Sequence, residues 1–150
     1  MKLIDTNSLI ILLVGLIDPK LINSHKRTSI YEEQDFYDLV SVIERIESLI
    51  VLPNVWTEVD NLLNNFNKGH KEKYIHHVIE TIKSTTEIYL ETKTATKSNG
   101  FYDLGITDSL LLEHSKECEL LITSDSYLSD YALANGIKIF DLVKNRNERL

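Results

Sequence analysis

Apolar residues along this chain occur in two patterns. Short continuous runs at 2–4, 49–52, 120–123 and 137–140 have the length of buried strands, and 88–90 is a weaker candidate. Elsewhere apolar residues recur every three or four positions, which predicts helices over 36–47, 55–66, 71–84, 107–118 and 127–134. Strands that alternate with helices predict an α/β fold with a central, mostly parallel sheet and helices on both of its faces.

The start of the chain is the clearest junction between a strand and a helix. An apolar run stops at Asp5, and Asn7 or Ser8 is suited to cap the helix that follows. The apolar segment 9–17 is too short for a membrane span, which needs about 20 residues, and no cleavage site for a leader peptide follows it. We therefore expect a buried first helix.

Other local signals are less regular. The polar segment 18–35 reads as a surface loop and 144–150 as a polar tail. Asn54 can cap the helix from 55, and Gly69 can end it. The phase of that helix places Glu58 at the border of its apolar stripe and Asp60 in water.

Composition narrows the class of protein. A chain of 150 residues with 43% hydrophobic and 26% charged residues is expected to form one domain over 1–150. A single cysteine, Cys118, allows no internal disulfide and favours a reducing, cytoplasmic setting without a membrane. The net charge of −7 argues against a broad basic surface for nucleic acid, although acids that chelate metal ions also contribute negative charge.

Four acids carry the chemical signal. Asp5 and Asp125 directly follow predicted strands, Asp108 lies at the start of a helix that Thr107 can cap, and Glu58 borders the core. The carboxyl ends of parallel strands share one edge of a sheet, so these groups can converge there. Converging carboxylates repel one another unless a cation lies between them. Oxygen ligands without His or Cys favour Mg²⁺ or Mn²⁺.

Such a centre is suited to hydrolysis of a phosphodiester bond. Asn7 could support the ligands, and Thr123, Ser124 or Ser126 could orient the substrate or a bound water. Each acid also has a simpler interpretation. Asp125 can be only a helix cap, and Asp108 only a favourable charge in a first helical turn.

Four segments together resemble the acidic motifs of PIN domains. In chain order they are 2–7 with Asp5, 52–59 with Glu58, 104–111 with Asp108 and 121–125 with Asp125. The resemblance extends from Lys2 to Phe140. The long interval between Asp5 and Glu58 departs from the compact toxins of the family.

The resemblance implies a three-layer α/β/α sandwich and a hydrolase that uses Mg²⁺ or Mn²⁺. Its catalytic and metal-binding residues would be Asp5, Glu58, Asp108 and Asp125, with Asp103 and Asp130 as nearby acids that could join or replace them. The activity expected is that of an endoribonuclease acting on single-stranded RNA. Many small members are toxins of the VapC type, which implies an antitoxin partner in a toxin–antitoxin pair and a homodimer.

RNA would also need cations for its phosphates. Lys68, Lys71 and Lys73 form the densest basic patch, which can equally be a solvated helix face, and Lys26 and Arg27 are competitors. Two other functions stay open. One is a PIN-like module without catalysis that binds RNA or a protein. The other is a phosphohydrolase of the haloacid dehalogenase type, which would have an Asp where this chain has Asn7.

Overall fold

The computed structural model describes residues 1–150 apart from the side chain of Lys68. Its centre is a sheet of five parallel strands in the order β3-β2-β1-β4-β5, with β1 in the middle. The strands are β1 Lys2–Ile4, β2 Leu49–Val51, β3 Thr86–Glu87, β4 Leu120–Thr123 and β5 Ile139–Asp141. Only β3 departs markedly from the predicted runs, since it precedes 88–90.

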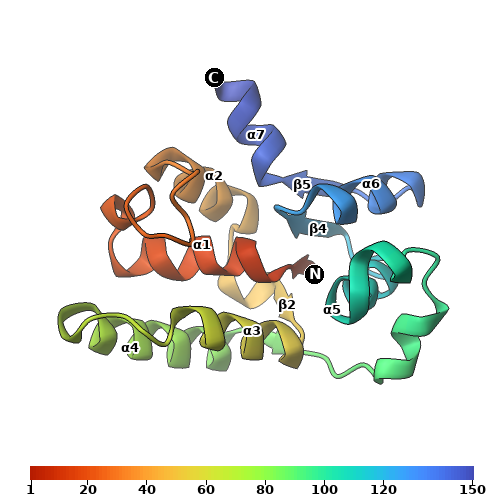
Figure 1. The fold of residues 1–150 in the computed structure, drawn as a ribbon, viewed down its shortest axis with the longest axis horizontal. Helices are drawn as coiled ribbons and strands as arrows, with labels where there is room; N and C mark the ends of the chain where they lie inside the picture. Colours follow the sequence, from red (N-terminus) through yellow and green to blue (C-terminus); the bar gives the residue numbers. More distant parts are fainter.

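Helices cover both faces of this sheet (Figure 1). On one face α1 packs against α2, α3 and α4, and on the other α5 packs against α6. The predicted α/β class and its three-layer α/β/α arrangement are therefore confirmed. The helices are α1 Thr6–Ile17, α2 Glu33–Ile43, α3 Pro53–Leu63, α4 Lys68–Ser84, α5 Phe101–Ser115, α6 Ser126–Ala134 and α7 Leu142–Arg149, with short 3₁₀ turns at Pro19–Leu21, Ile46–Ser48 and Thr92–Lys97.

Helix α1 is the core of the larger helical layer. Its residues from Ser8 to Gly15 are all buried, because three helices and the sheet surround it. A side chain on Gly15 would overlap the ring of Phe36, so only glycine lets α2 pack this closely. The apolar run is thus a buried helix as predicted. No helix in the described part of the chain has the length and apolar character that a membrane span requires.

Several predicted caps are wrong. The cap of α1 is Asp5 itself, whose side chain accepts from the backbone N–H of Ser8, so neither Asn7 nor Ser8 has that role. Helix α3 begins at Pro53, which suits a first helical position because it lacks an N–H, rather than after an Asn54 cap. Gly69 does not end a helix but lies in the first turn of α4.

The segment 18–35 is only partly the predicted surface loop. It contains a 3₁₀ turn at Pro19–Leu21, and α2 already begins at Glu33. Ile22, Thr28 and Tyr31 are buried within it, so the segment is anchored to the core. Glu44 has a φ of 65° and ends α2 at Ile43, four residues before the predicted end at 47.

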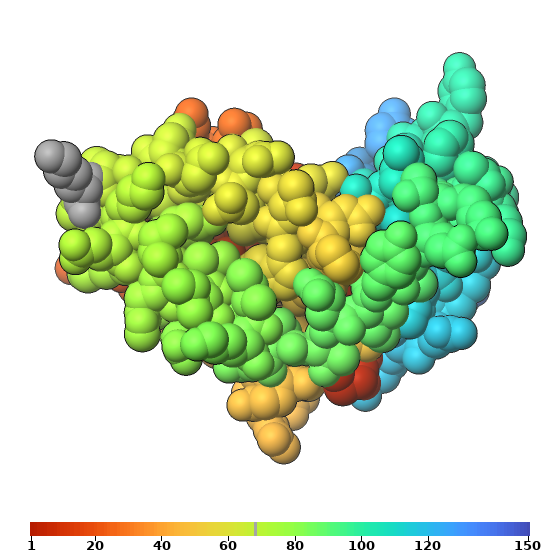
Figure 2. Space-filling model, turned by 90° about the horizontal axis from the view of Figure 1, so that it is seen from below, coloured from red at the N-terminus to blue at the C-terminus, as the bar shows by residue number. Residues whose placement is uncertain are grey.

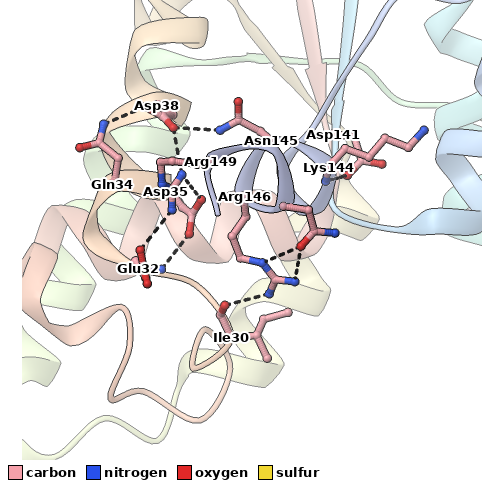
Figure 3. Close-up of polar contacts among 11 residues, drawn as sticks. Ile30, Glu32, Gln34, Asp35, Asp38, Asp141, Lys144, Asn145, Arg146 and Arg149 are labelled. Carbon is pink, nitrogen blue, oxygen red and sulfur yellow. Dashed lines mark hydrogen bonds and ion pairs between the residues drawn. The ribbon is translucent and has the colours of Figure 1, made fainter.

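The predicted polar tail 144–150 is instead the main part of helix α7 (Figure 3). Asp141 caps this helix by accepting from the N–H of Lys144 at 3.0 Å. Arg149 donates to Asp35 at 2.8 Å and to Asp38 at 3.2 Å, and Asn145 also donates to Asp38. Polar contacts to α2 therefore dock a helix that has almost no apolar periodicity, which is why its pattern did not predict it.

Replacing Arg149 by Met should destabilise the fold. The Asp35 side chain is fully buried and would lose its cation, whereas its other contact, from the Glu32 N–H, would remain. Leaving a buried carboxylate unpaired costs about 2–4 kcal/mol, which urea denaturation would measure as a lower free energy of unfolding. Arg45→Met is the control, since its pair with Glu47 is exposed; its loss should stay within about 0.5 kcal/mol. Equal losses would contradict the role of Arg149.

Candidate active site

The middle of the sheet brings two of the predicted acids together. Strands β1 and β4 are neighbours, and Asp5 and Asp125 follow their carboxyl ends. The chain leaves β1 for β2 on one side and later reaches β4 on the other, so this is the point where the strand order reverses. Ligands of open α/β sheets bind in the crevice that such a reversal creates.

All four predicted acids line a single pocket at this edge. The pocket has a volume of about 300 Å³, which is the lower end of the range for small-ligand sites. Asp5 and Asp125 enter from the sheet, Glu58 from α3 and Asp108 from α5. The complete lining is Asp5, Thr6, Asn7, Glu58, Asn61, Leu62, Asp108 and Asp125.

Asp5 is held on both carboxylate oxygens. Oδ2 accepts from the Thr123 hydroxyl at 2.6 Å and from the Ser124 N–H at 3.0 Å, while Oδ1 accepts from the Ser8 N–H at 2.9 Å. Thr123 Oγ1 in turn accepts from the N–H of Asp125 at 3.0 Å. One hydroxyl therefore connects the two acids at the ends of neighbouring strands, so Thr123 and Ser124 contact Asp5, while their predicted role in orienting a substrate or water stays a prediction.

Glu58 is braced by threonines from the two sides of the pocket. Thr6 on α1 donates to Oε1 at 2.5 Å, and Thr107 on α5 donates to Oε2 at 2.8 Å. Thr107 therefore does not cap a helix as predicted, because its hydroxyl is directed at Glu58. The two contacts join helices from opposite faces of the sheet across one carboxylate.

Asp108 owes its position to a break in α5. Gly105 has φ 73° and ψ −164°, a conformation essentially restricted to glycine, and it separates the first turn of α5 from the stretch that carries Asp108. Among the described residues, none donates a hydrogen bond to the Asp108 carboxylate. Asp108 is thus the least constrained acid of the four.

The electrostatics of the pocket are unfavourable for four ionised carboxylates. Burial, and then the charges of Asp5, Asp125 and Glu58, raise the pKa of Asp108 to about 7. Burial also raises the pKa of Asp5, although hydrogen bonds from Ser8, Thr123 and Ser124 oppose the shift. A carboxyl group that is protonated near neutral pH would lose its proton to solvent when a cation binds beside it, because the cation stabilises the ionised carboxylate.

The pocket residues suit a hard divalent cation in their chemistry. They supply carboxylate and hydroxyl oxygens, the donor types that Mg²⁺ and Mn²⁺ prefer. As they stand, no three His, Cys, Asp or Glu side chains of the described residues are close enough to hold a metal ion. Binding would therefore require the carboxylates to draw together, and Asp108 is the one that no described hydrogen bond holds in place.

The remaining predicted supporting residues are placed less centrally. Asn7 lines the pocket but is exposed, and Ser126 is exposed at the first position of α6 outside the lining. Asp125 does cap α6 by accepting from the Leu128 N–H at 2.9 Å, so the simpler interpretation of this residue is also correct. Its second oxygen is left for the pocket.

Several nearby acids do not join the pocket. Asp103 accepts from the Tyr131 hydroxyl at 2.6 Å and Asp130 is exposed on α6, so neither belongs to the lining. Asp141 ends β5 at the same edge of the sheet but accepts from Ser129 and caps α7. Asp60 is exposed as predicted, yet it also accepts from the buried Tyr74 at 2.9 Å.

The predicted basic patch lies apart from the acids. Lys71 and Lys73 are exposed on α4, and neither lines the acidic pocket. The side chain of Lys68 lies outside the described part of the structure. Figure 2 shows the face that α3, α4 and the chain from 85 to 110 form, with the first turns of α4 at the end away from α5.

Three residues of the lining, Thr6, Asn61 and Leu62, were not predicted as functional, nor was Thr107, which donates to Glu58. Thr6 and Thr107 are chain neighbours of Asp5 and Asp108, and Asn61 is one helical turn after Glu58. Those spacings were visible in the sequence. The direction of each side chain was not, because it depends on which helices meet at the pocket.

Comparison with known proteins adds nothing to this geometry. No protein-family model, curated protein or solved structure gives a significant match to the chain. The assignment of the pocket therefore depends on its residues and their arrangement.

The raised pKa of Asp108 predicts how stability depends on pH without metal. Between the ordinary value of 3.8 and about 7, the folded protein holds this proton more tightly than the unfolded chain. A rising pH in that interval therefore lowers the free energy of unfolding. Asp108→Asn should remove this decline and be more stable than the original by roughly 2–4 kcal/mol above neutral pH.

Urea denaturation in EDTA at several pH values would measure this difference. Asp108→Asn is the suitable variant because it disturbs no hydrogen bond of the described residues, whereas Asp5→Asn would bring an amide against the N–H of Ser8 or the donors Thr123 and Ser124. If the free energy of unfolding of the two proteins changed with pH in the same way, the raised pKa of Asp108 would be contradicted.

Proposed function

We propose that this protein is a divalent-metal-dependent endoribonuclease of the PIN type that hydrolyses phosphodiester bonds in single-stranded RNA. The observation that carries the proposal is the convergence of Asp5, Glu58, Asp108 and Asp125 on one pocket at the carboxyl edge of a parallel sheet. Burial, together with repulsion from the other three acids, raises the pKa of Asp108 to about 7, which gives the pocket a reason to take up a cation.

The four acids have different parts in this proposal. Asp5 is rigid and buried, with three donors on its two oxygens, and would fix the position of the cation. Glu58 is aligned by two threonine hydroxyls and Asp125 by the start of α6. Asp108, which no described residue contacts by a hydrogen bond, would complete the set of carboxylates that hold the cation. A bound Mg²⁺ or Mn²⁺ would supply an activated water and stabilise charge on the phosphoryl and leaving oxygens.

The shape of the site supports a chain-like substrate. A pocket beside Glu58 and Asp108 continues past Leu104 and Ile106, and another beside Asn7 and Leu62 continues past Tyr31. The acidic pocket is therefore not a closed cavity, and two further pockets that share residues with it could extend it into a groove. A polymer can cross such a groove, which favours internal cleavage of RNA over hydrolysis of a small phosphate ester.

Two alternatives are separated by particular residues. A haloacid dehalogenase-type phosphohydrolase would have a second acid two positions after Asp5, where Asn7 is exposed at the rim. A silent binding module would have no need of a complete, repulsive set of acids. The role of toxin in a toxin–antitoxin pair, with an antitoxin and a homodimer, follows only from the resemblance and stays a prediction.

Cleavage of labelled single-stranded RNA by the purified protein would test the proposal. We expect cleavage with Mn²⁺ or Mg²⁺ and none in EDTA. Asp108→Asn and Glu58→Gln should each lower the rate by about 100-fold or more, because each removes a cation ligand. Asp60→Asn is the matched control on the same helix, since its amide oxygen can still accept from Tyr74; it should cleave within about twofold of the original.

Metal binding can be measured independently of cleavage. Mn²⁺ should raise the melting temperature of the original protein and of Asp60→Asn, because a ligand that binds only the folded state stabilises it. Asp108→Asn should lose most of this increase. Metal stabilisation without RNA cleavage would contradict the nuclease and leave the metal site. Absence of both would favour the silent module.

A further inference from the structure

A second pocket borders the acidic one and carries the opposite charge. It shares Asn7 and Leu62 with the acidic pocket and has a volume of about 310 Å³. Its cations are Lys26 and Arg27, both from the segment between α1 and α2. The complete lining is Asn7, Lys26, Arg27, Ser29, Ile30, Tyr31, Leu62, Ser124 and Val143.

The segment that carries these cations is anchored from within. Ile22 and Thr28 are fully buried on either side of the pair, and the Thr28 hydroxyl donates to the Ile22 carbonyl at 2.5 Å. The N–H of Arg27 donates to Nδ1 of His25 at 3.1 Å, and the His25 ring lies 5.0 Å from that of Phe66. Lys26 and Arg27 are thus presented by a fixed turn.

Helix α7 supports the same segment from the other side (Figure 3). Arg146 donates to the carbonyl of Ile30 at 2.9 Å, and its guanidinium carbon lies 5.9 Å from the centre of the Tyr31 ring. Tyr31 is buried where it lines the second pocket, beside Ser124, which also donates its N–H to Asp5. The basic and acidic pockets are therefore parts of one connected structure.

The charges of Lys26 and Arg27 are not used within the fold. Both residues are exposed, and among the described side chains neither forms an ion pair. Arg149, by contrast, contacts three carboxylates. Burial, and then the charges of Lys26 and Arg27, lower the pKa of His25, as expected beside cations that nothing neutralises. Two free cations held at a groove can bind an anion.

RNA needs such cations at this place. A chain of net charge −7 with four carboxylates in its pocket repels a polyanion, and a metal ion offsets that repulsion only at the phosphate it contacts. The neighbouring phosphates need their own counter-charges. Lys and Arg provide them without reading the sequence of bases.

We propose that Lys26 and Arg27 form a subsite for the backbone phosphates of single-stranded RNA next to the cleavage site. The inference rests on the proposed function, because it takes the acidic pocket as the place of cleavage. The strand would pass from the basic pocket across Asn7 and Leu62 to the acids, and leave past Leu104 and Ile106. The segment between α1 and α2 would then be part of the substrate groove.

Fluorescence anisotropy with a labelled single-stranded RNA of about 12 nucleotides would test the subsite, with Asp108→Asn in every protein to prevent cleavage. We expect the double variant Lys26→Gln, Arg27→Gln to bind about tenfold more weakly. A plot of log affinity against log salt concentration should have a slope that is shallower by about 1.4 for this variant, since two phosphate contacts of a single strand are lost.

Two other double variants remove the same charge elsewhere. Lys83→Gln with Lys97→Gln changes two exposed lysines that line none of the three pockets, and should bind within about twofold of the parent. Lys71→Gln with Lys73→Gln tests the rival patch on α4. A loss that follows this pair, or that is equal for all three, would overturn the subsite.

The same variants without Asp108→Asn separate this proposal from the proposed function. If RNA is cleaved but the Lys26, Arg27 variant binds like its parent, the nuclease stands and the subsite is overturned. If RNA is not cleaved but binding is lost only in that variant, the nuclease is overturned and the subsite stands as an RNA-binding surface. A parent protein that binds no RNA overturns the subsite.

Discussion

The hydrogen bonds to the Asp5 carboxylate are the contacts on which this architecture depends most. They tie the end of β1 to the end of β4 through Thr123 and Ser124, and they start α1 through Ser8. The central strand pair, the most buried helix and the floor of the pocket therefore share one side chain. A carboxylate is suited to this because it accepts several donors at once, but its burial costs free energy and raises its pKa.

Of the other three acids, two are stabilised by hydrogen bonds from described residues and one, Asp108, is not. Asp125 is stabilised at a helix start, and Glu58 by two hydroxyls. Asp108 has neither form of support, and burial and the charges of the other three acids raise its pKa. In the function we propose, this is useful, since the least stabilised carboxylate gains most from a cation and no described hydrogen bond holds it in place.

Charge outside the pocket follows a similar division. Cations at the end of the chain are used within the fold, where Arg149 and Arg146 fasten α7 to α2 and to the segment before it. Lys26 and Arg27 in that segment are not. The C-terminal helix thus supports the basic pocket, whose lining includes its Val143, and this links a structural ion-pair cluster to the proposed path of the substrate.

The sequence by itself determined the fold class, because the lengths of apolar runs and their helical periodicity report local burial. It also indicated Asp5, Asp108 and Asp125, since acids at strand ends and helix starts of a parallel sheet can converge at one edge, and Glu58, at the border of the apolar stripe of its helix. Local patterns failed at the caps, where Asp5 rather than Asn7 starts α1, and at α7, whose polar sequence hides a helix docked by ion pairs.

Only the tertiary structure decided what each acid contacts. The threonines that brace Glu58 come from helices on opposite faces of the sheet, and the kink at Gly105 sets the direction of Asp108. It also showed that Lys26 and Arg27, rather than the lysines of α4, line a pocket that shares residues with the acidic pocket. These relations join residues far apart in the chain, and periodicity carries no information about such distances. Their physical origin is the packing of helices and loops around the sheet, which brings the side chains together only in the folded protein.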